Sequence, residues 1–179
     1  MIRRRPGFLL LVIVVVAAVA YLVLRGGDEG KRAVSHAELV AEVNSACDKL
    51  ISEGRELDAP YRPYGPESES YFASFLDLVE GIKSSLAELK PPAGDEAAHR
   101  TLVAGYTRLE TDLEEAQGAA AVEQDPEVVA RIDEIETTTK RTAEAEKALG
   151  ACPGGASVAA LPGLLRRTVP NPLQQTGEF

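Results

Sequence analysis

The sequence contains no tryptophan, one methionine and two histidines, and aromatic residues make up only 5% of it. Because β-sandwiches rely on aromatic and β-branched strands, this composition, rich in Ala, Leu and Glu, favours helices instead. The chain also lacks a G-x-S-x-G nucleophile motif, a P-loop and a dinucleotide-binding fingerprint. With so few histidines, the options for acid–base catalysis are limited. We therefore expect no enzymatic activity, no catalytic residue and no cofactor.

Basic residues are scarce over most of the chain. From residue 35 onward there are 13 Lys/Arg against 26 Asp/Glu, a net charge of −13, whereas the first 34 residues carry +4. A surface of this charge repels phosphate backbones, so nucleic acid is not an expected partner. The acidic surface serves solubility in the simplest interpretation. Capture of cations or of a basic partner is the alternative.

One long stretch, residues 8–24 (FLLLVIVVVAAVAYLVL), carries no charge. Its 17 residues match the shortest helices that cross a bilayer. Three arginines in the basic segment 1–7 favour a cytoplasmic N-terminus. We therefore predict a single-pass transmembrane signal anchor that places the rest of the chain outside the cytoplasm. The Ala18-Val19-Ala20 triplet leaves an alternative, which is secretion after signal cleavage following Ala20.

After a flexible, glycine-containing tether at 25–34, four segments show apolar residues at the spacing of amphipathic helices. Their predicted inner faces are Leu39, Val40, Val43, Cys47, Leu50 and Ile51; Phe72, Phe75, Val79, Ile82, Leu86 and Leu89; Leu102, Tyr106, Leu109, Leu113, Ala116 and Ala120; and Val128, Ile132, Ile135 and Thr139. Short connections favour antiparallel neighbours, so we predict an all-α fold in which residues 35–152 form an up-down antiparallel four-helix bundle. Residues 153–179 are predicted to be a largely disordered tail, apart from a turn or two of helix at 161–167.

The predicted helices have recognisable end signals. At the first helix, Ser35 and Glu38 match a capping box, in which the hydroxyl and the carboxylate satisfy free backbone N–H groups. The prolines of Lys90-Pro91-Pro92 are expected to stop the second helix, and Asp95 is the expected N-cap of the third. For the fourth helix, Asp125 is the expected cap, Pro126 follows it at the first helical position, and Gly150 ends the helix.

The chain has two cysteines, Cys47 inside the first predicted helix and Cys152 just beyond the fourth. In an antiparallel bundle the end of the fourth helix returns to the end of the domain where the first helix begins. An oxidising compartment makes a disulfide the expected state of such a solitary pair. We therefore predict a Cys47–Cys152 disulfide. Two free thiols, or a redox or metal-binding pair, are the alternatives.

The histidines allow one candidate metal site. Glu96 and His99 have the i, i+3 spacing of the carboxylate–imidazole pairs used in metal-binding bundles. His36 begins the first helix at the same end, so the three side chains could share a divalent ion. However, a Cys47–Cys152 disulfide would place His36 about 16 Å beyond the end of the fourth helix, at 1.5 Å per residue. The two predictions compete, and we expect no metal.

Three short motifs, Asn44-Ser45-Ala46-Cys47, Leu89-Lys90-Pro91-Pro92 and Leu149-Gly150-Ala151-Cys152, resemble those of a loose group of actinobacterial membrane-anchored or secreted helical proteins. These proteins have an N-terminal and a C-terminal cysteine, and the resemblance covers roughly residues 36–153. It implies a helical architecture and an extracytoplasmic location. It implies no catalytic residue, because the group shares no established activity.

Together these patterns predict a membrane-anchored extracytoplasmic helical module of the cell envelope, with an interaction or structural role and an envelope protein as its partner. A ligand-sensing or small-molecule-binding domain is the first alternative, which a cavity lined by Phe72, Phe75 and Tyr106 would indicate. A metal-binding protein that uses Glu96 and His99 is the second.

Overall fold

The computed structural model describes residues 30–60, 67–122, 124–153 and 157–167. Over these residues the chain is mostly helical, as predicted. The elements are α2 (His36–Glu56), α3 (Glu67–Ala87), α4 (Glu96–Ala121), α5 (Asp125–Ala148), η2 (Val158–Ala160, a 3-10 helix) and α6 (Leu161–Leu165). The predicted anchor, 8–24, lies outside the described residues, as does the basic segment 1–7. In the part of the chain that is described, no helix combines the length and the apolar character needed to cross a membrane.

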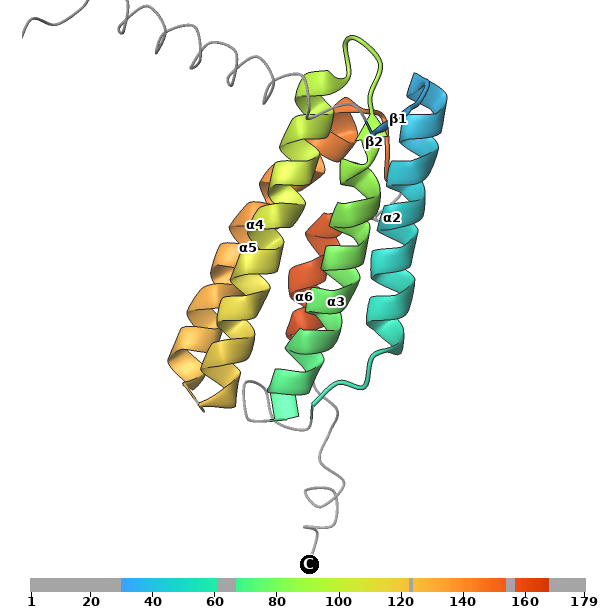
Figure 1. Cartoon of the computed structure of the whole chain (residues 1–179). Coiled ribbons are helices and arrows are strands. Elements are labelled where there is room, and N and C mark those ends of the chain that lie inside the picture. The colour runs from blue at the N-terminus through green and yellow to red at the C-terminus, as the bar shows by residue number, and fades with distance from the viewer. Residues whose placement is uncertain (1–29, 61–66, 123, 154–156, 168–179) are drawn as a thin grey trace, which may run out of the picture. The chain divides into compact units, whose positions relative to one another are not determined.

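Helices α2, α3, α4 and α5 lie side by side and alternate in direction (Figure 1). Each packs on the next one along the chain, and the contact between α4 and α5 is the most extensive. Helix α2 packs on α3, while η2 and α6 contact both α2 and α5. The C-terminal elements therefore lie between the first and the last of the long helices.

The short helix predicted at 161–167 is present as α6, whereas η2, in the stretch predicted to be disordered, was not expected. Their apolar side chains are buried in the core: Val158, Leu161, Leu164 and Leu165. The Tyr71 hydroxyl of α3 also donates a hydrogen bond to the Leu164 carbonyl oxygen, at 2.7 Å. The prediction of disorder is wrong for residues 157–160, because Val158 and the apolar residues of α6 fill the space between α2 and α5. Residues 168–179 lie outside the described residues.

A two-stranded sheet of β1 (Arg32–Ala33) and β2 (Leu89–Lys90) was not predicted. Next to it, the Val34 N–H donates a hydrogen bond to the Lys90 carbonyl oxygen at 3.1 Å, and the Val34 side chain is buried. The last three residues of the flexible tether predicted at 25–34, Arg32 to Val34, are therefore part of the folded domain. The proline stop explains the pairing, because it ends α3 and leaves an extended backbone with free hydrogen-bonding groups.

The predicted apolar faces form the core of the domain. All six predicted inner residues of the second helix and its C-terminal extension, and all six of the third helix, are buried. Burying an apolar side chain of this size contributes roughly 1.5–3 kcal/mol relative to leaving it exposed. The spacing of apolar residues therefore selected the correct face of each helix.

The helix ends follow the predicted signals, with two differences. The Ser35 capping box is present: the Ser35 N–H donates to Glu38 Oε2 at 2.7 Å, and the Glu38 N–H donates to Ser35 Oγ at 3.3 Å. Asp95 occupies the N-cap position of α4, but its side chain makes no capping hydrogen bond. The N-cap of α5 is Gln124 rather than Asp125, which becomes the first helical residue. There its negative charge still interacts favourably with the helix dipole.

Candidate functional site

The predicted disulfide joins Cys47 and Cys152, whose Cα atoms are 6.1 Å apart. Gly150, with a φ of +73°, ends α5 in a Schellman turn, a conformation that glycine adopts without the steric cost of a Cβ. The turn brings Cys152 to the middle of α2, where its N–H donates a hydrogen bond to Asn44 Oδ1 at 2.6 Å. Local backbone geometry at the end of α5 thus places the two sulfur atoms together.

A buried carboxylate lies next to the disulfide. Glu146 is only 1% exposed. Its Oε2 accepts a hydrogen bond from Ser157 Oγ at 2.6 Å, and its Oε1 accepts one from the Val158 N–H at 3.4 Å. Burial raises the pKa of Glu146, and the hydrogen bond from Ser157 opposes this rise. Since both donors are neutral and belong to the C-terminal elements, Glu146 fastens η2 to α5.

The surroundings of Glu146 are closed to solvent. The Tyr106 side chain is fully buried, and its hydroxyl has no hydrogen-bond partner among the described residues. Burial, and then the negative charge of Glu146, raise the pKa of Tyr106. Ligand atoms of Glu146, Cys47 and Cys152 lie within 4.8 Å of one another, but the two sulfur atoms are bonded to each other. The disulfide and the residues around it therefore have a structural role at this end of the domain.

The structure does not bring the predicted metal ligands His36, Glu96 and His99 together. Instead, His36 Nδ1 lies 2.7 Å from Asp95 Oδ2, and buried His99 has its Nε2 2.9 Å from the Leu86 carbonyl oxygen. Glu96 is exposed to solvent. The clusters of close metal-ligating atoms in the described part of the chain include none of the three. The contact with His36 also explains why the Asp95 side chain does not cap α4.

The aromatic residues that we considered as the lining of a ligand cavity are part of the core. Phe72, Phe75 and Tyr106 are each at most 1% exposed. They line none of the hollows described below. Their side chains therefore serve packing between the helices and give no support to a cavity at that position.

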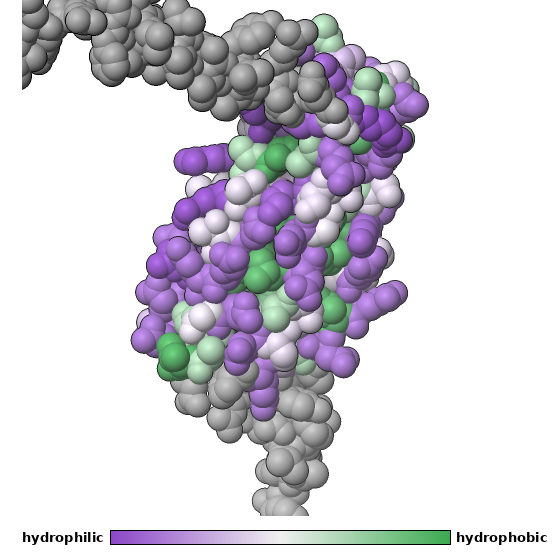
Figure 2. All heavy atoms as spheres, viewed as in Figure 1, coloured by the Kyte–Doolittle hydropathy of each residue, from purple (hydrophilic) through white to green (hydrophobic). Residues whose placement is uncertain are grey.

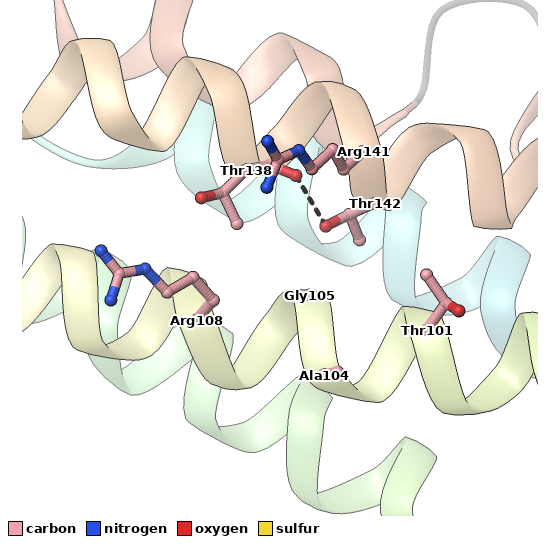
Figure 3. Close-up of a pocket in the computed structure, with 7 residues that line it drawn as sticks. All are labelled: Thr101, Ala104, Gly105, Arg108, Thr138, Arg141 and Thr142. Atoms are coloured by element: carbon pink, nitrogen blue, oxygen red, sulfur yellow. Dashed lines mark hydrogen bonds between the residues drawn. The ribbon is translucent and has the colours of Figure 1, made fainter.

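A groove of about 220 Å³ runs between α4 and α5 (Figure 3). Its lining residues are Thr101, Ala104, Gly105 and Arg108 from α4, and Thr138, Arg141 and Thr142 from α5; we call it the α4–α5 groove. At its floor the helices come very close, because a Cβ atom on Gly105 would lie 2.1 Å from Thr142 Oγ1. A second hollow, of about 470 Å³, shares three of these residues and adds Asp133, Glu134 and Thr137.

A second buried carboxylate holds two side chains of this groove. Asp112 is fully buried, and its Oδ2 accepts a hydrogen bond from Thr138 Oγ1 at 3.0 Å. Its Oδ1 lies 2.9 Å from Arg108 Nη2, in an ion pair whose alignment is not that of a hydrogen bond. Burial is the main cause that raises the pKa of Asp112. Asp112 therefore positions one groove residue from each helix.

Three carboxylates near the groove lie close enough to suggest a cation site. They belong to Asp112, Glu115 and Glu134. However, Arg131 pairs with Glu115 at 2.7 Å and with Glu134 at 2.9 Å, and Arg108 pairs with Asp112. Since arginines already neutralise these carboxylates, the cluster is an ion-pair network between α4 and α5.

Sequence reasoning missed both buried carboxylates and the groove. A signal for Glu146 was present, because the inner face of α5 continues from Thr139 through Thr142 to Glu146 at spacings of three and four. A charged residue at such a position marks a buried charge. No comparable signal indicated the groove, because it depends on how closely α4 approaches α5.

Comparison with known proteins identifies no relative: no protein-family model, no curated protein and no solved structure matches the chain. The resemblance to actinobacterial envelope proteins therefore stays a prediction. The function is argued below from the chemistry of the described residues.

Proposed function

We propose that this protein is a membrane-anchored extracytoplasmic helical module of the cell envelope, with an interaction or structural role and no enzymatic activity. In this proposal residues 8–24 cross the membrane with the N-terminus in the cytoplasm. Helices α2 to α5 form an up-down antiparallel four-helix bundle outside the cytoplasm, and α6 closes it. An envelope protein is the proposed partner.

The observation that carries this proposal is the disulfide. Cys47 and Cys152 are 105 residues apart in the sequence, and both are buried. Disulfides form and persist in oxidising compartments and are rare in the cytosol. Closing a loop of this length stabilises the folded state by about 4–5 kcal/mol in the chain-entropy model. That contribution requires the bond to stay oxidised, which supports a location outside the cytoplasm.

A non-enzymatic role is supported by where the ionisable groups lie. Carboxylates with raised pKa values are common in active sites. Here the two such carboxylates, Glu146 and Asp112, are buried and hydrogen-bonded within the domain. The imidazoles of His36 and His99 are each within hydrogen-bond distance of a protein oxygen. Glu146 and the two histidines do not line the hollows described above, and Asp112, next to the α4–α5 groove, is paired with Arg108 and Thr138.

The surface supports a partner that makes polar contacts. On the face shown in Figure 2, hydrophilic residues predominate and hydrophobic residues form small, separate spots. The large hydrophobic side chains that are exposed in the described residues are Val122 and Val129. Large exposed apolar patches mark stable apolar interfaces. We therefore propose that charge and hydrogen bonding dominate the contact with the envelope partner.

Protease shaving of intact cells tests the location. With a C-terminal epitope tag, we expect external protease to digest the chain from residue 35 onward, while a cytoplasmic marker protein stays intact. Non-reducing mass spectrometry should find the domain lighter by two hydrogens than its reduced form. A chain that resists protease in intact cells but not in lysed cells would contradict the proposal. Release of a chain that begins after Ala20 would instead show the secreted alternative.

A small-molecule-binding role is the second candidate, and the α4–α5 groove favours it. The groove is open to solvent and contains two arginines and several hydroxyl groups. Ligand sites combine a concave surface with a few convergent polar groups. This candidate is compatible with the same envelope location, because a tethered domain can bind a ligand and a partner on different faces.

A further inference from the structure

We propose that the α4–α5 groove binds a small acidic sugar. The arginines would bind the oxyanion of the sugar (carboxylate or phosphate), and the threonines would accept hydrogen bonds from its hydroxyl groups. The proposal rests on the ligand-binding candidate above and is independent of where the protein is located. It follows from the donors and acceptors that face the groove.

The oxyanion would lie between two guanidinium groups. In Figure 3, Arg108 reaches the groove from α4 and Arg141 from α5, and both side chains extend toward the same end, away from Thr101. A guanidinium group presents a planar fork of N–H donors that matches a carboxylate or a phosphate. Two such forks from opposite walls point to an anion as the ligand.

Both arginines keep hydrogen-bond donors available. Arg141 is exposed and forms no ion pair or hydrogen bond with its side chain among the described residues, although the domain is strongly acidic. Arg108 pairs with Asp112 at 2.9 Å and with Glu134 at 3.7 Å, and both contacts use Nη2. Its Nε and Nη1 donors are therefore free of these ion pairs. The buried Asp112 carboxylate holds Arg108 in place without occupying all of its donors.

The threonines of the groove supply acceptors rather than donors. Thr101 Oγ1 donates its hydrogen to the Ala97 carbonyl oxygen, and Thr138 Oγ1 donates to Asp112. Thr142 Oγ1 donates to the Thr138 carbonyl oxygen at 2.9 Å, as the dashed line in Figure 3 marks. Thr142 is only 1% exposed, so its hydroxyl is not available to a ligand; Thr101 and Thr138, with their hydrogens engaged, offer only lone pairs. A ligand that fits must therefore carry its own donors, and sugar hydroxyls are such donors.

The size and the charges of the groove limit the ligand further. At about 220 Å³ it is smaller than the roughly 300–1,000 Å³ of sites for drug-sized ligands, which favours a single sugar unit. Asp133 and Glu134 border the adjoining hollow. Their carboxylates repel a second anionic group and accept hydrogen bonds from hydroxyls. The oxyanion is therefore expected beside Arg108 and Arg141, with the hydroxylated ring along the groove.

Titration calorimetry on the purified full-length chain tests the proposal with four probes. Glucuronate and glucose 6-phosphate carry the two oxyanions on a hydroxylated ring, glucose lacks the anion, and inorganic phosphate lacks the ring. We expect at least one of the two acidic sugars to bind, at least about tenfold more tightly than glucose or inorganic phosphate. The one that binds identifies the oxyanion. Binding of neither, or equal binding of glucose, would overturn the proposal.

Matched variants locate the binding. Arg141→Gln should weaken binding at least about tenfold, whereas Arg100→Gln, which removes the same charge from an exposed position outside the groove, should leave it unchanged. Ala104→Leu should block the groove without a change of charge, and Ala97→Leu, on the same helix, should not. Equal losses from the two arginine variants, or full binding by Ala104→Leu, would overturn the proposal. Neither result depends on protease shaving, so the location and the ligand can fail separately.

Discussion

The two buried carboxylates of this domain, Glu146 and Asp112, lie in different regions and have different kinds of partner. Glu146, next to the disulfide, has neutral hydrogen-bond donors, the Ser157 hydroxyl and the Val158 N–H. Asp112, next to the α4–α5 groove, has Thr138 and the guanidinium of Arg108. Burial raises the pKa of both carboxylates. The difference lies in the partner: one carboxylate fastens the C-terminal elements, while the other holds a cation at the surface.

This difference separates a region built for stability from a region that can take part in binding. Leaving a buried carboxylate without a cation is costly, so the disulfide end depends on the hydrogen bonds that the C-terminal elements supply. At the groove the cation extends into solvent, with 54% of the Arg108 side chain exposed. We therefore expect substitutions at the disulfide end to reduce the free energy of unfolding most, and those at the groove to reduce it less.

The largest effect is expected when the disulfide is removed. Replacing both Cys47 and Cys152 with alanine should lower the free energy of unfolding by about 4–5 kcal/mol, because the unfolded chain regains the entropy of a loop of about 100 residues. Chemical denaturation under non-reducing conditions measures this loss. Reduced wild-type protein is the control and should lose a similar amount. Unchanged stability of the double variant would show that the bond does not constrain the domain.

The next largest effect is expected at Glu146. The change Glu146→Ala removes the acceptor of two hydrogen bonds and leaves a cavity, which should cost about 3 kcal/mol. Glu144→Ala, at an exposed position of the same helix, is the matched control and should change stability by less than about 0.5 kcal/mol. Denaturant midpoints of the two variants give the comparison. Equal losses would mean that Glu146 does not fasten the C-terminal elements.

Glu146 should also make stability depend on pH. Its folded pKa is raised above the ordinary value of 4.5. The folded state therefore binds the proton more tightly, so this contribution is fully present below pH 4.5 and is lost as the pH rises through the folded pKa. Glu146→Gln, which cannot ionise, should lack this decline, so its stability relative to wild type should increase with pH. A constant difference between the two proteins from pH 4 to 8 would contradict the assignment.

A smaller effect is expected at the floor of the groove. Gly105→Ala should destabilise the domain by about 2 kcal/mol, because the new methyl group would overlap Thr142 and push α4 away from α5. Gly118→Ala, in the same helix with open space around it, should stabilise by about 0.5–1 kcal/mol through helix propensity. Thermal unfolding distinguishes the two. A gain at both positions would mean that the helices are not in close contact at Gly105.

The smallest effect is expected for Arg108→Gln, at about 1 kcal/mol. The substitution leaves Asp112 with Thr138 as its partner, but solvent already screens the exposed guanidinium. Adding Asp112→Asn should recover most of the loss, because the buried charge disappears together with its counterion. A double-mutant cycle measures this coupling. Simple additivity of the two changes would show that Arg108 does not stabilise the Asp112 carboxylate.

Features that depend on neighbours within a few residues could be read from the chain. The apolar spacing of α3 and α4 identified the buried faces, and the Ser35–Glu38 pattern identified the start of α2. The disulfide could also be predicted, since chain direction alone brings the end of α5 back toward α2. The start of α5 was wrong by one residue, because Gln124 occupies the N-cap position although its side chain makes no capping hydrogen bond.

Features that depend on residues far apart in the sequence emerged only when the helices were packed. Asp95 has the right position for a cap but contacts His36, 59 residues earlier. The C-terminal elements pack between α2 and α5, a position that no local pattern shows. The α4–α5 groove likewise exists because Gly105 meets Thr142. The physical reason is range: backbone preferences and apolar periodicity act over one or two helical turns, whereas burial, ion pairing and grooves depend on distances between helices.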